Sequence, residues 1–237
     1  MSDARGEIVY RGQHMAFTVR HADRGTLQIS VHPDGAVDVV APLGVVYEDI
    51  HARVERRARW IASQQAYFAQ FDPRTPARRF VSGETHLYLG RQYRLRVEAG
   101  EQDFVKLVSG RFLVSVCGVV TPERVEGLLI AWYREKAAIR LGERVGACWE
   151  RFANPEMEMP RVRIRQMRTR WGTMSRSGLL SLNVDLVRAP RECIDYVILH
   201  ELCHLEYPDH GAGFRARLEQ VLPDWEKRKH RLELALA

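Results

Sequence analysis

Cysteine is scarce in this 237-residue chain, and its four cysteines form no CxxC pair. Cys117, Cys148, Cys193 and Cys203 lie far apart in the sequence. Neither a disulfide framework nor an all-cysteine zinc site is therefore indicated. We expect the four thiols to be reduced and mostly buried.

Long apolar runs are also missing. The opening segment, MSDARGEIVYRGQHM, has no apolar core of the length that a signal peptide needs, and no later run approaches the length of a membrane span. The sequence therefore predicts a cytoplasmic protein with no membrane partner.

A strong excess of one charge is absent too. Lys and Arg number 36 against 30 Asp and Glu, which gives a net charge of +6. This balance mildly favours anionic partners, but it is common on ordinary soluble surfaces. Nucleic acid therefore stays an alternative partner that the composition does not favour.

The first half of the chain has the pattern of short strands. Alternating apolar residues on both sides of the Pro-Asp-Gly turn at 33–35 predict a hairpin. A helical period replaces this alternation over 46–71. Strand-like segments resume at 83–100 and 103–118, and the glycines between them are typical of a meander. We expect a β-rich region with one helix over residues 1–120.

The second half is expected to be mainly helical. Thr121 followed by Pro122 is a good N-cap and first-turn pair, and it predicts a long helix to about Phe152. One strand region follows, and a further helix begins at Ala189-Pro190 and is ended by Pro208. The predicted fold class is α+β, with a mainly helical region over residues 121–237.

The segment HELCHLEYPDH, residues 200–210, contains three of the nine histidines. His200 and His204 are four residues apart, so on a helix their rings lie on one face and can bind one cation together. Glu201 is placed where a carboxylate can reach a metal-bound water without being a ligand. Zinc lowers the pKa of such a water to about 7. The pattern predicts Zn²⁺ as cofactor and hydrolysis with Glu201 as general base.

A zinc site needs at least a third protein ligand. His210 is the nearest candidate, just beyond the proline that we expect to end the helix, and Glu219 and Glu226 are later acidic alternatives. The spacing HExxHxxxxxH also fits the metzincin template. However, Tyr207 replaces the glycine of that template and no methionine follows Met174, so a true metzincin is rejected.

Arginines are dense just before the histidine helix. Those at 161, 163 and 165 alternate with apolar residues, so on a strand their side chains face one way. They could line a substrate cleft and bind phosphate or carboxylate groups, or they could form a solvated strand face with acidic neighbours. The whole group comprises Arg161, Arg163, Arg165, Arg168, Arg170 and Arg176. Arg163, Arg165 and Arg170 are our candidate substrate-binding residues.

The stretch RTRWGTMSRSGLLSLNVDLVRAPRECIDYVILHELCHLEYPDHGAGF resembles the YgjP-like metallopeptidase domain family, which is related to WLM- and SprT-type metalloproteases. The upstream segments PDGAVDVVAP, ARWIASQQ and SGETHLYLGRQYRL resemble it too, so the likeness covers most of the chain. The resemblance implies a zincin-like catalytic part, zinc bound by His200, His204 and His210, Glu201 as base, and a peptide or protein substrate.

The chain departs from the family pattern at a few positions. Thr173-Met174-Ser175 stands where the family has Ser-Cys-Ser, Asp209 replaces the usual Asn, and Arg215 follows Phe214 where Trp is common. None of these departures falls on a proposed metal ligand.

Two other functions stay open. The family has also been linked to nucleoside triphosphate pyrophosphohydrolysis, which the arginines would suit. The third hypothesis is a nucleic-acid-associated protein with a structural zinc. An open coordination position would favour an enzyme, whereas a closed four-ligand site would favour the third hypothesis.

Overall fold

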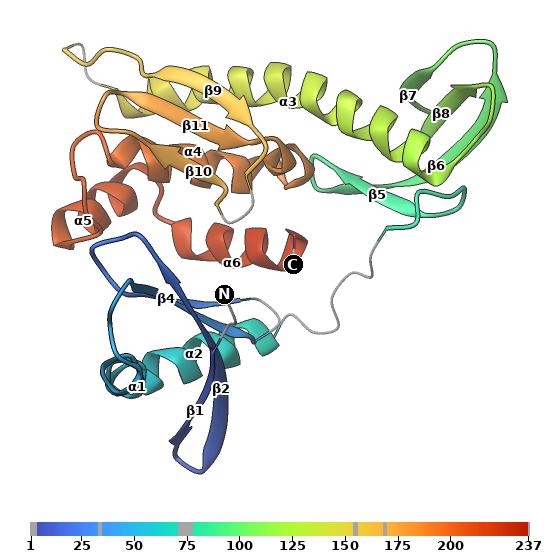
Figure 1. Cartoon of the computed structure of the whole chain (residues 1–237). Helices are drawn as coiled ribbons and strands as arrows, with labels where there is room; N and C mark the ends of the chain where they lie inside the picture. The colour runs from blue at the N-terminus through green and yellow to red at the C-terminus, as the bar shows by residue number, and fades with distance from the viewer. Residues whose placement is uncertain (1–3, 33–34, 71–77, 154–155, 168–169, 237) are drawn as a thin grey trace. The chain divides into compact units, whose positions relative to one another are not determined.

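The computed structural model describes residues 4–32, 35–70, 78–153, 156–167 and 170–236. It has the predicted α+β composition and divides into two compact units, Met1–Thr75 and Pro76–Leu236 (Figure 1). This division differs from the boundary expected near residue 120. The strands just before residue 120 share a core with the helices that follow, because Phe112 and Val114 pack in one cluster with Leu129 and Trp132.

The first unit is a four-stranded sheet in the order β1-β2-β4-β3 with two helices. The predicted hairpin is confirmed, since β3 and β4 pair antiparallel, but its turn residues Pro33 and Asp34 lie outside the described residues. Two helices stand where one was expected, because the backbone leaves the helical region at Arg57. The elements are β1 (Ala4–Tyr10), β2 (Gln13–Ala22), β3 (Gln28–Val31), β4 (Val37–Pro42), α1 (Tyr47–Arg56) and α2 (Ala58–Ala69).

The second unit begins with a four-stranded sheet in the order β5-β6-β8-β7. The expected meander is wrong, because β6 pairs with β8 in parallel and β7 lies at the edge. β8 lies inside the sheet, between β6 and β7, and its Phe112, Val114 and Val116 are completely buried. The strands are β5 (Thr85–Tyr88), β6 (Arg91–Gly100), β7 (Phe104–Val108) and β8 (Arg111–Cys117).

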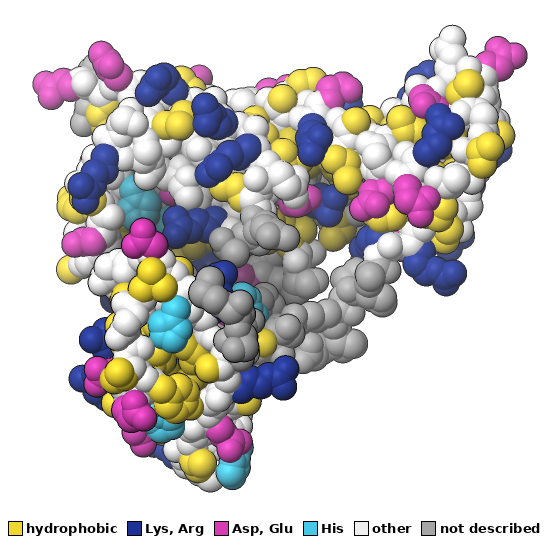
Figure 2. Space-filling model, in the orientation of Figure 1, with side chains coloured by type: hydrophobic (Ala, Val, Ile, Leu, Met, Phe, Trp, Pro, Cys, Tyr) yellow, Lys and Arg dark blue, Asp and Glu magenta, His cyan; other side chains and the backbone are white. Residues whose placement is uncertain are grey.

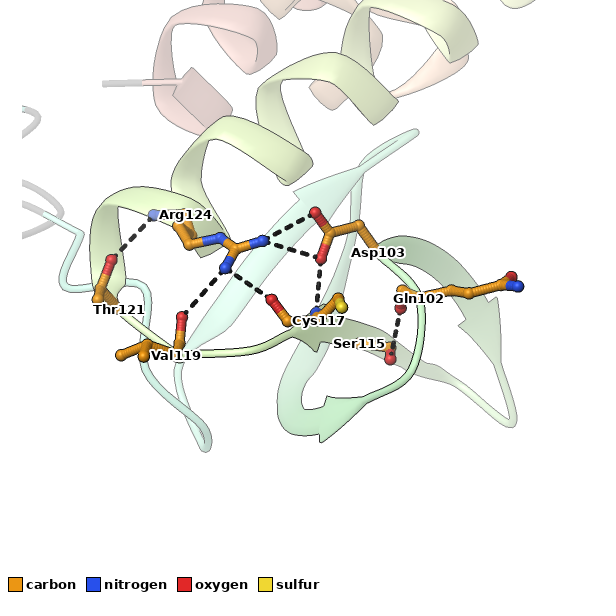
Figure 3. A network of polar contacts seen from close by, with 7 residues as sticks. All are labelled: Gln102, Asp103, Ser115, Cys117, Val119, Thr121 and Arg124. Atoms are coloured by element: carbon orange, nitrogen blue, oxygen red, sulfur yellow. Dashed lines mark hydrogen bonds and ion pairs between the residues drawn. The ribbon is translucent and has the colours of Figure 1, made fainter.

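The long helix α3 (Pro122–Phe152) begins as predicted, with the Thr121 hydroxyl accepting a hydrogen bond from the backbone N–H of Arg124. A network of polar contacts fixes this end to the sheet (Figure 3). The Arg124 guanidinium donates to the Asp103 carboxylate at 3.0 Å and to the Cys117 carbonyl at 2.6 Å. The same carboxylate accepts from the Cys117 N–H at 2.7 Å. The start of α3 is therefore anchored to the end of β8.

The remaining elements surround the histidine helix, α4 (Arg191–Cys203). A three-stranded sheet has the order β10-β11-β9, with β9 parallel and β10 antiparallel to β11. The sequence did not predict β10. The elements are β9 (Arg161–Arg165), β10 (Gly172–Met174), β11 (Leu179–Asn183), the 3-10 helix η1 (Val184–Arg188), α5 (Ala212–Val221) and α6 (Trp225–Leu236).

Helix α4 is the buried centre of the second unit. Its Asp195 carboxylate accepts two hydrogen bonds of 2.7 Å from the Arg144 guanidinium on α3, and this pairing compensates the buried charge. The helix ends at Cys203 rather than at Pro208, because the N–H groups of residues 204 to 206 bond to the carbonyls three residues back. No helix within the described residues is long and apolar enough to cross a membrane.

The prediction that the cysteines are mostly buried is confirmed. Cys148, Cys193 and Cys203 are buried and Cys117 is exposed, and all four thiols are free. Burial raises the pKa of Cys148 and of Cys203 to about 12. These two thiols therefore stay protonated and inert near neutral pH.

Candidate active site

The three histidines of the HELCHLEYPDH segment come together in space. His200 lies in the last turn of α4, His204 caps that helix, and His210 lies just before α5. One nitrogen from each ring lies within 4.8 Å of the other two. The Nε2 atoms of His200 and His210 are 3.1 Å apart. Nitrogen atoms this close can converge on a single cation.

The protonation states suit metal binding. Burial, with the other two histidines, lowers the pKa of His200 to about 4, and burial also lowers the pKa of His210. Both rings are therefore neutral near pH 7, which is the form that binds a metal. His204 Nδ1 lies 3.0 Å from the Tyr207 carbonyl, an acceptor that holds the ring proton on Nδ1 and leaves Nε2 available as a ligand.

The alternative third ligands lie elsewhere. Glu219 on α5 and Glu226 on α6 are exposed, and neither belongs to the one group of candidate ligands found among the described residues. That group consists of His200, His204 and His210. Three imidazoles are a donor set that Zn²⁺ accepts, so these residues fit the metal that the sequence pattern predicts.

Glu201 is buried on the cleft side of α4, at 8% exposure. Burial raises its pKa to about 7, although a hydrogen bond from the Met174 backbone and the positive charge of Arg170 act in the opposite direction. A carboxyl group with a pKa near the working pH is well matched to accept and return a proton.

Strand β10, which the sequence did not reveal, lies directly against Glu201. A Cβ atom added to Gly172 would lie 2.7 Å from Glu201 Cγ and 3.1 Å from Val197 Cγ1. Such distances leave no room for any side chain at this position. Gly172 therefore lets the strand approach the carboxyl group closely.

We expect Gly172→Ala to lower the free energy of unfolding by about 1–3 kcal/mol through overpacking and to displace Glu201. Gly142→Ala on α3 is the matched control, because a Cβ there meets nothing within 4 Å. It should raise that free energy by about 0.5–1 kcal/mol, as alanine favours a helix. Urea unfolding of both variants measures the difference, and equal stabilities would contradict the close approach.

An open cleft of about 850 Å³ lies over the histidines and Glu201. Arg170 and Arg176 line it. Arg163 and Arg165 are exposed on β9 and do not line this cleft. The strand order explains the difference, since β11 separates β9 from β10. Arg168 lies outside the described residues.

Three further residues line the cleft beside the candidate site residues, and they are Tyr196, Lys229 and Glu233. Tyr196, one turn before His200, places its ring edge-on to that imidazole at 5.8 Å and stacks on Trp225. Lys229 and Glu233 enter the cleft from α6. The spacing of four to His200 places Tyr196 on the same face of the helix, either as packing or as support for that histidine, but no local pattern relates α6 to the histidines.

A histidine triad with an adjacent buried glutamate in an open cleft is the arrangement that metal-dependent hydrolases use. The family model "YgjP-like, metallopeptidase domain" matches residues 25–235, and the chain belongs to this family. The resemblance read from the sequence is thereby confirmed. A search of curated proteins gives no match.

Two solved structures show distant similarity. The metallopeptidase zymogen of Pyrococcus abyssi abylysin is 21% identical, with 38% of this chain and 90% of that chain covered and a TM-score of 0.35. The metallopeptidase zymogen of Methanocaldococcus jannaschii jannalysin is 23% identical, with 40% and 86% covered and a TM-score of 0.34. TM-scores this low do not establish a shared fold.

Proposed function

We propose that the protein is a zinc-dependent peptidase in which His200, His204 and His210 hold the metal and Glu201 is the general base. The observation that carries this proposal is the convergence of three imidazole nitrogens within 4.8 Å beside a buried glutamate. Bound there, zinc would supply a Lewis acid that polarises the scissile carbonyl and acidifies water.

Glu201 moves the proton in this proposal. One oxygen of its carboxylate accepts a proton from the attacking water and then gives it to the nitrogen of the departing amine. The Met174 N–H and the close packing of Gly172 hold the carboxylate in one orientation. Without the metal, burial raises the pKa of Glu201 to about 7.

The position of β10 supports a peptide as substrate. Among the described strands it pairs only with β11, so it is an edge strand there, and all three of its residues line the cleft. The unpaired backbone groups of an edge strand can bind an extended peptide as one more strand. A nucleotide would make no use of this feature.

A nucleotide remains the second candidate because of the charges in the cleft. Arg170, Arg176 and Lys229 all line it, and cations of this kind suit a triphosphate. The nucleic-acid hypothesis gains less support. On the face drawn in Figure 2, basic side chains lie among acidic and apolar ones rather than in one continuous patch.

A direct comparison of substrates tests the proposal. Zinc-loaded protein is offered an unfolded protein and a mixture of nucleoside triphosphates, with Glu201→Gln as the blank for both. We expect new peptide termini, detected by mass spectrometry, from the wild type alone. Pyrophosphate release that depends on Glu201, without any peptide cleavage, would contradict the peptidase proposal and support a nucleotide hydrolase instead.

The cleft arginines should select for acidic substrates. Arg170→Gln should lower the preference for an acidic over a neutral peptide by about 1.5–3 kcal/mol, the size of a charge-assisted contact. Arg163→Gln, exposed on β9, is the matched control and should leave the preference unchanged. The ratio of kcat/KM values for the two peptides is the measurement, because it cancels any effect of Arg170 on Glu201. Equal ratios in both variants would remove Arg170 from substrate binding.

A further inference from the structure

Glu233 on α6 is a carboxyl group in the cleft for which the proposed reaction has no use. It is half-buried, and its Oε2 atom is buried without a hydrogen-bond partner among the described residues. Burial raises the pKa of this group to about 7. A buried polar atom with no partner is uncommon and costs stability, so its presence in a cleft calls for an explanation.

The surroundings of Glu233 distinguish it from the rest of the cleft. The charged side chains that line the cleft are Arg170, Arg176 and Lys229, which are basic, and two glutamates, Glu201 and Glu233. Glu201 is committed to proton transfer in the proposed function. Glu233 is the other acidic group, and it is not a member of the group of candidate metal ligands. It is therefore available to a bound substrate.

Lys229 does not neutralise Glu233 in the structure. The two lie four residues apart on α6 and both line the cleft, but no ion pair joins them among the described residues. Lys229 is exposed, whereas Glu233 is half-buried. A lysine placed before a glutamate at this spacing is also the less favourable order on a helix.

Resting on the proposed peptidase function, we infer that Glu233 determines specificity by receiving a cationic nitrogen of the peptide substrate. That nitrogen belongs either to a lysine or arginine side chain or to the free α-ammonium group, since both offer the same charged N–H donors. The cation would give the Glu233 carboxyl group, which lines the cleft and whose Oε2 has no partner among the described residues, a counter-charge at one fixed place. In the otherwise basic lining of the cleft, this place would set the register of the peptide.

Cleavage profiling tests this role. Zinc-loaded wild type, Glu233→Gln and Glu226→Gln are given a library of peptides, half of it N-acetylated. We expect the wild type to prefer peptides with a cation at one position by about tenfold or more, the size of one charge-assisted contact. Glu233→Gln should lose this preference. Glu226→Gln should keep it, because that exposed glutamate on the same helix does not line the cleft.

The library also separates the two sources of the cation. A preference lost on N-acetylation identifies the α-ammonium group, and one lost when lysine is replaced by glutamine identifies a side chain. A binding measurement without turnover supports the assignment. Fluorescein-labelled lysine and glutamine peptides should bind to Glu201→Gln with different Kd values, and the added Glu233→Gln change should make those values equal.

The outcomes are distinct. No preference for a cation in the wild type, or the same preference in Glu233→Gln, would overturn this role of Glu233. If cleavage still depends on Glu201 in that case, the proposed peptidase function stands. Absence of peptide cleavage by the wild type would overturn the proposed function, and the role of Glu233 with it.

Discussion

Replacing Glu201 by glutamine should lower hydrolysis by at least about two orders of magnitude, because an amide cannot accept the proton of the attacking water. Glutamine has nearly the same shape as glutamate, so it should fit against Gly172 without a clash. Metal content and the free energy of unfolding should therefore be retained. Turnover with saturating zinc, beside metal analysis of the same samples, measures both effects.

Glu219→Gln on α5 is the matched control for this substitution, since that glutamate is exposed and outside the cleft. It should behave as the wild type in both measurements. Turnover by Glu201→Gln close to that of the control would remove the general-base assignment. Loss of metal from Glu201→Gln would instead make Glu201 part of the metal site.

Removal of any one histidine should weaken zinc binding at least about a hundredfold, because each is one of the three ligands that we propose. We expect His200→Ala, His204→Ala and His210→Ala to lose the metal on dialysis. They should also lose the stabilisation that zinc gives the wild type, which is about 2.7 kcal/mol when free zinc exceeds Kd a hundredfold. Elemental analysis and thermal unfolding with and without zinc provide the two readouts.

The assignment of His210 as the third ligand has its own test. His210 lies outside α4. Its side chain is exposed, whereas that of His200 is half-buried. Full metal occupancy in His210→Ala, together with loss of metal in Glu219→Ala or Glu226→Ala, would show that the third ligand is one of these glutamates.

Features that depend on neighbouring residues were predictable from the sequence. The spacing of four between His200 and His204 follows from the helical period, and Thr121-Pro122 marks the start of α3 because a cap needs only its own turn. His210 lies close enough in the sequence for one turn of chain to return it to the other two. The whole histidine cluster was therefore within reach of local reasoning.

Strand neighbours were not predictable in the same way. Alternation along residues 161–165 indicates which side chains share a face, but it does not say which strand lies beside which. The sheet order places β10 rather than β9 at the cleft, so Arg163 and Arg165 are absent from its lining. For the same reason, the sequence led us to predict a meander where β6 and β8 pair in parallel.

Residues brought in by packing alone were missed altogether. Glu233 and Lys229 follow His204 by more than one helix, and no motif connects them to the metal site. Their place in the cleft depends on how α6 packs against α4, which is set by apolar side chains such as Leu232 and Trp225. Burial of a carboxylate without a partner can be recognised only when the packing is known.

Anomalous X-ray diffraction at the zinc edge from zinc-loaded crystals tests the central claim most directly. The account predicts one ion per chain, about 2.0–2.1 Å from a nitrogen of His200, His204 and His210, with a further coordination position open to water or substrate. An ion enclosed by four protein ligands, or one bound away from these three histidines, would contradict a catalytic zinc site.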